Sequence, residues 1–166
     1  TTAKGGLWYD TAPTTNDYSI RDLEVDCTGA DGRGFMYCTN LTNCTGIGTG
    51  GFGYGFSECT NLTNCTGTGT GTNGYGFVDC TNLTNCTGTG TGATNGIGFL
   101  SCANLTNCIG TGTGTTEGYG FYDITTASNC SDGGSSTAMW DGTNKNIDLD
   151  TCRYTPVTAN NTELNT

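Results

Sequence analysis

The sequence predicts an all-β, single-domain β-solenoid with about 21–22 residues per coil and a cap at each end. Phenylalanine recurs at an almost constant spacing, and each one begins a near-copy of the same segment: Phe35, Phe56, Phe77, Phe99 and Phe121. A fixed period of this length is typical of a solenoid, whose coils bury their cores only against neighbouring coils. Only 33% of the 166 residues are hydrophobic and 29 are glycine, which is little core for a compact globule.

Within one coil, from Cys59 to Gly71, the sequence reads C-T-N-L-T-N-C-T-G-T-G-T-G. If Cys65 points inward, the two-residue period of a strand also points Gly67, Gly69 and Gly71 inward and the intervening threonines outward. Asn73-Gly74 is a turn signal, and the Phe77 that follows supplies one large aromatic side chain to the core of each coil.

The repeat defines three regions, namely an N-terminal arm or cap over 1–19, solenoid repeats over 20–130 and a C-terminal cap over 131–166. Alternating apolar residues predict a degenerate first coil, which begins with a strand that contains Ile20, Leu23, Val25 and Cys27. In the last region, we expect an apolar set to pack over the final coil: Met139, Trp140, Ile147, Leu149, Cys152 and Tyr154.

Charge is concentrated at the two ends of the chain, whose net charge is −10. Between Gly34 and Phe121 there is no Lys or Arg, and the acids are Glu58, Asp79 and Glu117. The repeats therefore present a nearly neutral Thr/Asn/Gly surface, which argues against nucleic acid as a partner. No apolar run approaches the roughly 18 residues of a membrane span, so we expect no membrane insertion.

The motif F-x-x-C-x-x-L-x-x-C occurs at Phe56, Cys59, Leu62 and Cys65, and again at Phe77, Cys80, Leu83 and Cys86. It resembles the leucine-rich repeats of BspA-like bacterial surface proteins, over roughly residues 20–130. The Ile-Pro that follows the strand in that family is replaced here by Gly-Thr-Gly-Thr, so a parallel β-helix and a leucine-rich-repeat-like coil both remain open. The repeats also resemble Cys/Asn/Thr/Gly-rich arrays in phage tail and virion proteins.

The eleven cysteines fall into two predicted columns, with Cys152 left over. One contains Cys38, Cys59, Cys80 and Cys102 and continues in Ile124; the other contains Cys27, Cys44, Cys65, Cys86, Cys108 and Cys130. Ile124 indicates that the position requires a buried apolar group, as a free thiol provides. The alternative is a disulfide within each coil: Cys38–Cys44, Cys59–Cys65, Cys80–Cys86 and Cys102–Cys108. The chain has no histidine and lacks C-x2-C pairs, so we expect neither zinc nor another cofactor.

The outward threonines predict a flat grid that is our candidate binding face: Thr45, Thr49, Thr66, Thr68, Thr70, Thr87, Thr89, Thr91, Thr111 and Thr113. Residues two apart on a strand are separated by about 6.7 Å and neighbouring coils by about 4.8 Å. The array resembles the ice-binding face of β-solenoid antifreeze proteins, although Ile47 and Ile109 interrupt it. The simpler interpretation is that Thr suits exposed strand positions.

Three further columns are expected to be structural. Asparagines predict ladders at the corners of the coils: Asn40/Asn43, Asn61/Asn64, Asn82/Asn85 and Asn104/Asn107. Tyr54, Tyr75 and Tyr119 with Ile97 form either a packing column or a sugar-binding strip. Glu58, Asp79, Ser101 and Asp123 stand in one column without an evident facing carboxylate, and there is no histidine for a nucleophile relay.

These patterns predict a non-enzymatic structural or adhesive module of a phage tail fibre, virion appendage or bacterial surface fibre. We expect an extracellular or virion-surface location, with other subunits through self-assembly and cell-surface glycans as partners. The alternative is an ice-binding protein that uses the threonine grid.

Overall fold

The computed structural model describes residues 7–8, 19–135 and 138–141, and within these ranges it is all-β. Parallel strands stack into about five coils, which confirms the predicted β-solenoid. No helix that is long and apolar enough to cross a membrane is found in the described ranges.

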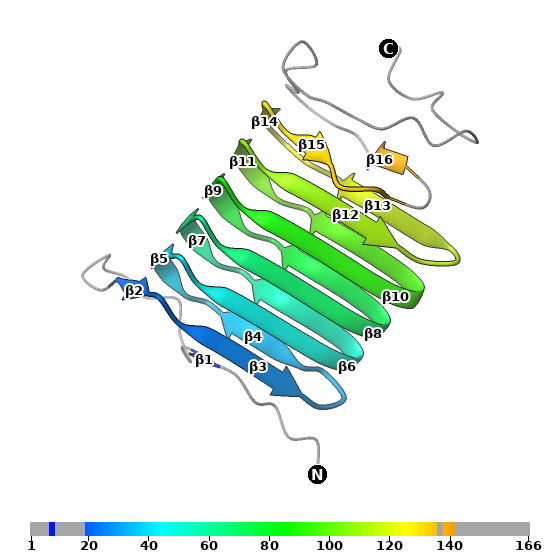
Figure 1. The fold of residues 1–166 in the computed structure, drawn as a ribbon, viewed down its shortest axis with the longest axis horizontal. Helices are drawn as coiled ribbons and strands as arrows, with labels where there is room; N and C mark the ends of the chain where they lie inside the picture. The colour runs from blue at the N-terminus through cyan, green and yellow to red at the C-terminus, as the bar shows by residue number, and fades with distance from the viewer. Residues whose placement is uncertain (1–6, 9–18, 136–137, 142–166) are drawn as a thin grey trace.

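Two parallel sheets run along the solenoid (Figure 1). The larger sheet follows the order β1 (Leu7–Trp8), β4 (Arg33–Met36), β6 (Thr45–Ser57), β8 (Thr66–Val78), β10 (Thr87–Leu100), β12 (Ile109–Thr113) and β15 (Ser131–Asp132). Three more strands join it, because β3 (Glu24–Thr28) pairs with β6, β13 (Glu117–Tyr122) with β10, and β16 (Ala138–Asp141) with β13. The smaller sheet follows the order β14 (Ala127–Ser128), β11 (Ala103–Thr106), β9 (Thr81–Thr84), β7 (Thr60–Thr63), β5 (Thr39–Thr42) and β2 (Ile20–Arg21).

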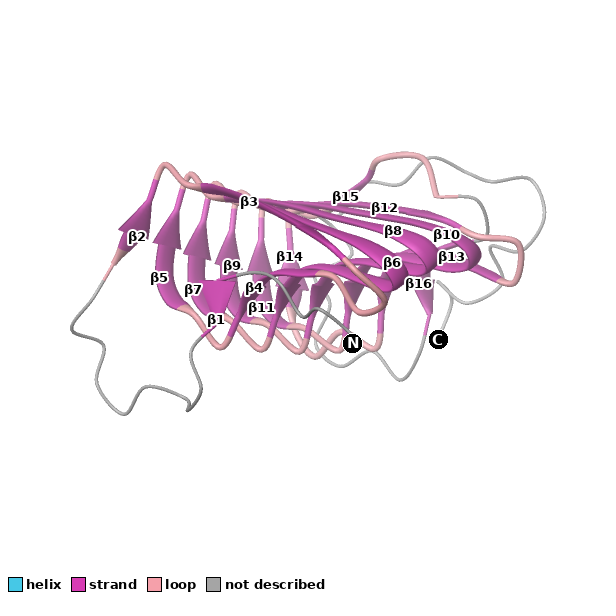
Figure 2. Cartoon of the chain, turned by 90° about the horizontal axis from the view of Figure 1, so that it is seen from below, coloured by secondary structure: helices cyan, strands magenta, loops and turns pink. Residues whose placement is uncertain are grey.

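Each long strand folds over on itself to form two walls of its coil, and the walls converge to a thin edge (Figure 2). The first half of β8 carries the Thr-Gly alternation, and Gly67 and Gly69 are buried as predicted. The inward position predicted for Gly71 is wrong, because the chain reverses there: Gly71 is exposed and has a φ of +137°. The turn predicted at Asn73-Gly74 is therefore wrong: Gly74 is buried, and a Cβ there would overlap the Gly69 carbonyl oxygen of the facing wall.

The core lies in the thick part of the coil, between the two sheets. Its phenylalanines stack ring on ring, with centroids 4.8–5.1 Å apart and planes within 4–5° of parallel. Columns of leucine and cysteine run beside them and are fully buried: Leu41, Leu62, Leu83 and Leu105, with Cys38, Cys59, Cys80, Cys102 and Ile124, and with Cys44, Cys65, Cys86, Cys108 and Cys130. The core residues of one coil are thus covered mainly by their equivalents in adjacent coils.

Cys27 does not belong to the column in which the sequence analysis places it. It pairs with Gly48 on the wall of the thin edge, and Leu23 takes the place beside Cys44, because the Thr45 amide donates to the Leu23 carbonyl. The repeat explains the shift, since one coil period back from Cys44 is Leu23 and one coil period back from Gly48 is Cys27. Leu23 is 39% exposed, so the first coil covers its column only partly.

The corners of the coils are built by polar residues in the left-handed region. Asn43, Asn64 and Asn85 have φ values of 53–54°, a conformation that asparagine tolerates better than most residues. Each side-chain amide donates to the equivalent residue one coil nearer the N-terminus. One ladder runs from Asn129 through Asn107, Asn85, Asn64 and Asn43 to the Asp22 carboxylate, and a second runs from Asn104 through Asn82 and Asn61 to Asn40.

Parallel pairing continues past residue 130, because β15 pairs with β12 and β16 with β13. Within the predicted C-terminal cap, the packing expected of Ile147, Leu149, Cys152 and Tyr154 falls outside the described residues. Of the predicted N-terminal arm over 1–19, the structure describes only Leu7–Trp8, which pairs with β4, and residue 19.

Candidate binding face

All ten predicted threonines lie in register on one wall of the solenoid, formed by the first halves of β6, β8 and β10 and by β12. We call this wall the threonine face. It has three columns: Thr45, Thr66, Thr87 and Ile109; Ile47, Thr68, Thr89 and Thr111; and Thr49, Thr70, Thr91 and Thr113. Alternation with buried glycine aims every member outward, and all ten threonines are exposed or partly exposed.

The face continues beyond the predicted threonines at both ends. Glu24, Asp26 and Thr28 of β3 pair with Thr45, Ile47 and Thr49, and at the other end Ser131 pairs with Ile109. These three β3 positions lie one coil period before positions 45, 47 and 49, so counting by the repeat period would have found them. A search for the Thr-Gly pattern does not find them, because β3 lacks the Thr-Gly alternation of the later repeats.

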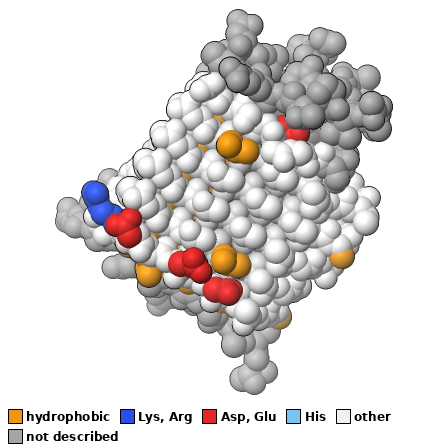
Figure 3. All heavy atoms as spheres, viewed as in Figure 1, with side chains coloured by type: hydrophobic (Ala, Val, Ile, Leu, Met, Phe, Trp, Pro, Cys, Tyr) orange, Lys and Arg blue, Asp and Glu red, His pale blue; other side chains and the backbone are white. Residues whose placement is uncertain are grey.

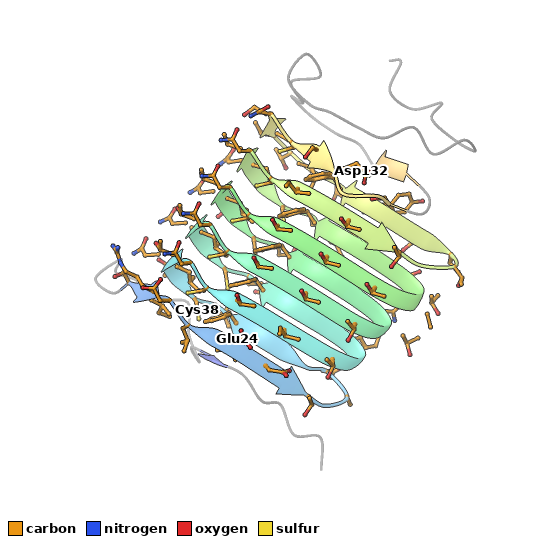
Figure 4. All side chains as sticks on the ribbon, in the orientation of Figure 1. Glu24, Cys38 and Asp132 are labelled. Atoms are coloured by element: carbon orange, nitrogen blue, oxygen red, sulfur yellow. The ribbon has the colours of Figure 1, made fainter. Side chains whose placement is uncertain are left out.

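The electrostatics of the face are set by its first row. Among the residues of the three columns and of β3, the charged ones are Glu24 and Asp26. Figure 3 shows the uncharged expanse over β6 to β12 and the acids at the β3 end, where Figure 4 labels Glu24. Thr hydroxyl and methyl groups therefore dominate the chemistry available to a ligand, with acids at one end.

The acid column stands apart from the threonine face, at the corner after the second wall. Glu58, Asp79, Ser101 and Asp123 all have φ near 50–54°, and the Ser101 hydroxyl donates to Asp123 at 3.2 Å. Asp79 is exposed, and the desolvation that remains, followed by the nearby carboxylates of Glu58 and Asp123, raises its pKa. Glu58 and Asp79 lie on successive coils, and Ser101 separates Asp79 from Asp123. Glycosidase chemistry instead uses two carboxylates that flank a bond.

The tyrosine column packs against itself. The rings of Tyr54 and Tyr75 stack at 5.4 Å, and the Arg33 guanidinium lies 4.6 Å from the centroid of the Tyr54 ring. Tyr75, Ile97 and Val78 are buried, and burial raises the pKa of both Tyr54 and Tyr75. Because these ring faces are occupied by neighbouring side chains, the column has the geometry of packing and not of an open sugar-binding strip.

The ten cysteines in the described residues are buried thiols that form no disulfide. Cys59 and Cys65, a predicted disulfide pair, lie at opposite ends of β7 and are not bonded to each other. Within the described ranges, no three Cys, Asp or Glu side chains gather in a way that could hold a metal ion.

Comparison with known proteins gives no further guide to the site, since no family model, curated protein or solved structure matches the chain.

Proposed function

We propose that this chain is a non-enzymatic structural and adhesive module of a fibre, such as a phage tail fibre, a virion appendage or a bacterial surface fibre. The observation that carries the proposal is the in-register repetition of the threonine face over successive coils. A surface of this kind binds through many weak, identical contacts, whose effect accumulates when they act together.

The coil stack is also suited to act as a stiff spacer. Successive coils are joined by parallel backbone pairing in both sheets, by stacked phenylalanine rings and by two asparagine ladders. These contacts recur at every coil of the repeat body, so bending at one level would disrupt hydrogen bonds in several columns at once. A module that holds a binding face away from a surface needs this property.

The size of the face favours an extended ligand or a multimeric assembly. Its columns span on the order of 20 Å by 15 Å, or about 300 Å². A stable one-to-one protein interface buries about 800 Å² on each partner. Cell-surface glycan chains and neighbouring subunits of a fibre, each of which offers repeated contacts, match the face better than a single globular partner.

The test combines electron microscopy with binding to glycan arrays. We expect filaments or defined oligomers, and glycan or subunit binding that is lost when Thr68→Tyr and Thr89→Tyr place two rings on the threonine face. The matched control is Thr63→Tyr with Thr84→Tyr, which places the same rings on adjacent strands β7 and β9 of the other sheet. A monomer that binds no glycan, or variants that lose binding equally, would contradict the proposal.

Ice binding is the second candidate, and the three-column Thr register favours it. A flat array of hydroxyl and methyl groups at about 4.8 Å and 6.7 Å spacings offers a repeating template to ordered water. Thermal hysteresis measured with the purified chain decides this candidate. We expect a freezing gap with faceted crystals. The Thr68→Tyr, Thr89→Tyr pair should abolish the gap, and the control pair should retain it. The absence of a gap in the unchanged protein would exclude ice binding.

A further inference from the structure

Nine cysteines form two columns through the core, and the proposed fibre function gives them no role. We call these the thiol columns: Cys38, Cys59, Cys80 and Cys102 in the first, and Cys44, Cys65, Cys86, Cys108 and Cys130 in the second. Each of these side chains is at most 1% exposed. The first column ends in Ile124, so the site accepts an aliphatic group of similar size without a sulfur.

Each thiol in the two columns acts as a hydrogen-bond donor. In the first column, Sγ donates to the backbone carbonyl two residues earlier at 3.3–3.4 Å, as Cys59 does to Ser57. In the second column the corresponding distances are 3.4–3.5 Å, as from Cys86 to Thr84. A disulfide has no S–H group, so oxidation would remove these bonds.

Within one coil, no disulfide links the two columns in the folded state. Cys59 and Cys65 lie at opposite ends of β7 and belong to different columns, and the buried Leu62 lies between them in the sequence. The same arrangement places Leu41 between Cys38 and Cys44, and Leu83 between Cys80 and Cys86.

Between coils the sulfurs are close, but the spacing is still unfavourable for a bridge. The backbone amide of Cys59 donates to Sγ of Cys80 at 3.4 Å, so neighbouring members of a column are in contact. In-register parallel strands hold equivalent Cβ atoms about 4.8 Å apart, whereas a disulfide holds them at about 3.5–4.5 Å. Bridging two coils would pull their strands together and disturb the ladders on either side.

We propose that this solenoid is a redox-dependent fold, which forms only while its cysteines are reduced and then shields them from oxidants. In an oxidising medium, two thiols of the unfolded chain react with oxidised glutathione. One protein disulfide forms, the glutathione disulfide breaks, and two reduced glutathione molecules leave with the two thiol protons. A bridge made in this way holds the chain outside the coil geometry.

Burial provides the shielding of the folded chain. It raises the pKa of the Cys59 and Cys80 thiols well above the usual value, so very little of the reactive thiolate is present at neutral pH. All nine thiols of the columns are at most 1% exposed and so closed to a dissolved oxidant, and the same reagent is therefore destructive before folding and ineffective after it.

Resting on the proposed function, this inference narrows the kind of fibre. A virion or phage appendage that folds in a reducing cytosol meets oxidants only after its thiols are buried. A surface fibre that crosses an oxidising compartment unfolded would be trapped with disulfides. The thiol columns therefore favour the virion appendage among the proposed forms.

The experiment refolds the full, reduced chain from denaturant into reduced or oxidised glutathione. We expect at least a tenfold lower yield of β-sheet circular dichroism and monodisperse protein with oxidised glutathione. Oxidised glutathione added after folding should leave the yield unchanged. Maleimide should then label all eleven cysteines of the reduced product by mass, with those of the thiol columns labelled only after denaturation.

A variant with Cys38, Cys59, Cys80 and Cys102 changed to Ile, the residue at 124, should lose part of its sensitivity to the oxidant. If that variant does not fold, the two arms of the unchanged chain still decide. Equal yields in both arms, or a native fold that carries any disulfide within the columns, would overturn the proposal. Neither result touches the fibre function, which is tested on the folded protein by microscopy and glycan binding.

Discussion

At the scale of single residues, the thin edge of the solenoid depends on glycine that lacks a Cβ. A Cβ at Gly69 would overlap the backbone nitrogen and oxygen of Tyr75 and the carbonyl oxygen of Gly53, so both the facing wall and the preceding coil would have to move. We expect Gly69→Ala to lower the free energy of unfolding by about 3 kcal/mol or more, the upper range for overpacking. Gly51→Ala, at an exposed position whose nearest contact is the Ala30 oxygen at 3.1 Å, should change it by less than about 1 kcal/mol. Urea unfolding followed by circular dichroism measures both, and equal effects would refute the account of the glycine walls.

Asp79 is a residue whose charge opposes folding. Modest desolvation of this exposed group and the carboxylates of Glu58 and Asp123 raise its pKa in the folded state. A raised carboxyl pKa means that the native state binds the proton more tightly than the unfolded chain, so acidification from neutral pH toward the ordinary value of about 4 relieves the penalty.

The corresponding prediction is that Asp79→Asn stabilises the protein at pH 7 by about 0.5 kcal/mol. The value is modest because solvent screens the repulsion between the carboxylates of Asp79 and Glu58. Asn also suits the φ of 51° at this corner. The gain should shrink as the pH falls from 7 toward the ordinary carboxyl value of about 4, because the wild-type carboxyl takes up its proton over this range. Asp123→Asn is the comparison, and it should gain less because Asp123 accepts the Ser101 hydroxyl. A pH-independent difference for Asp79→Asn would show that its charge is not the cause.

At the scale of elements, each asparagine of the ladders has two roles: it adopts the left-handed corner conformation, and it hydrogen-bonds to the neighbouring coils. Asn85 has a φ of 54°, donates to Asn64 at 3.2 Å and accepts from Asn107 at 3.0 Å. Asn85→Ala loses both hydrogen bonds and puts alanine, which tolerates the left-handed region less well than asparagine, at this φ, for a combined cost of about 2 kcal/mol. Asn85→Gly loses only the hydrogen bonds and should cost about 1 kcal/mol. Denaturant midpoints test this order, and an alanine variant more stable than the glycine variant would contradict it.

The elements also show where sequence reasoning succeeds and where it stops. The Phe period and the Thr-Gly alternation are periodic signals, and they correctly predict the coil, its core columns and the outward threonines. They do not reveal the reversal at Gly71, because Gly71 is one of a run of alternating glycines and its φ of +137° is invisible in a residue name. Grouping the cysteines by residue type places Cys27 in the wrong column. Counting back one coil period gives the correct positions, from Cys44 to Leu23 and from Gly48 to Cys27. Ligand identity leaves no periodic signal at all, so function stays a proposal.

At the scale of the whole molecule, the solenoid is a one-dimensional stack. Strands β6, β8 and β10 pair only with their neighbours in the stack, and each core column is continued by the next coil. Stability in such proteins is approximately a sum of coil and interface terms. Binding to a repetitive ligand should follow the same rule, because each coil adds one row of the threonine face.

Deletion of one complete coil therefore tests whether stability and ligand binding are both sums over the coils. Removing residues 59–79 excises β7 and β8 and joins Glu58 to Cys80, so that Phe56 meets Phe99 and the Thr45 row meets the Thr87 row in unchanged register. We expect a folded solenoid about 4.8 Å shorter, with a lower melting temperature and weaker binding to whichever ligand the threonine face takes. Removing residues 66–76 instead deletes most of β8, and with it the two walls of one coil. This deletion should prevent folding, because the walls of the neighbouring coils lose their partner. Circular dichroism and small-angle scattering report the fold and length. If the one-coil deletion unfolds the chain, the coils are not independent units; if it folds and binds with undiminished strength, the face is not used row by row.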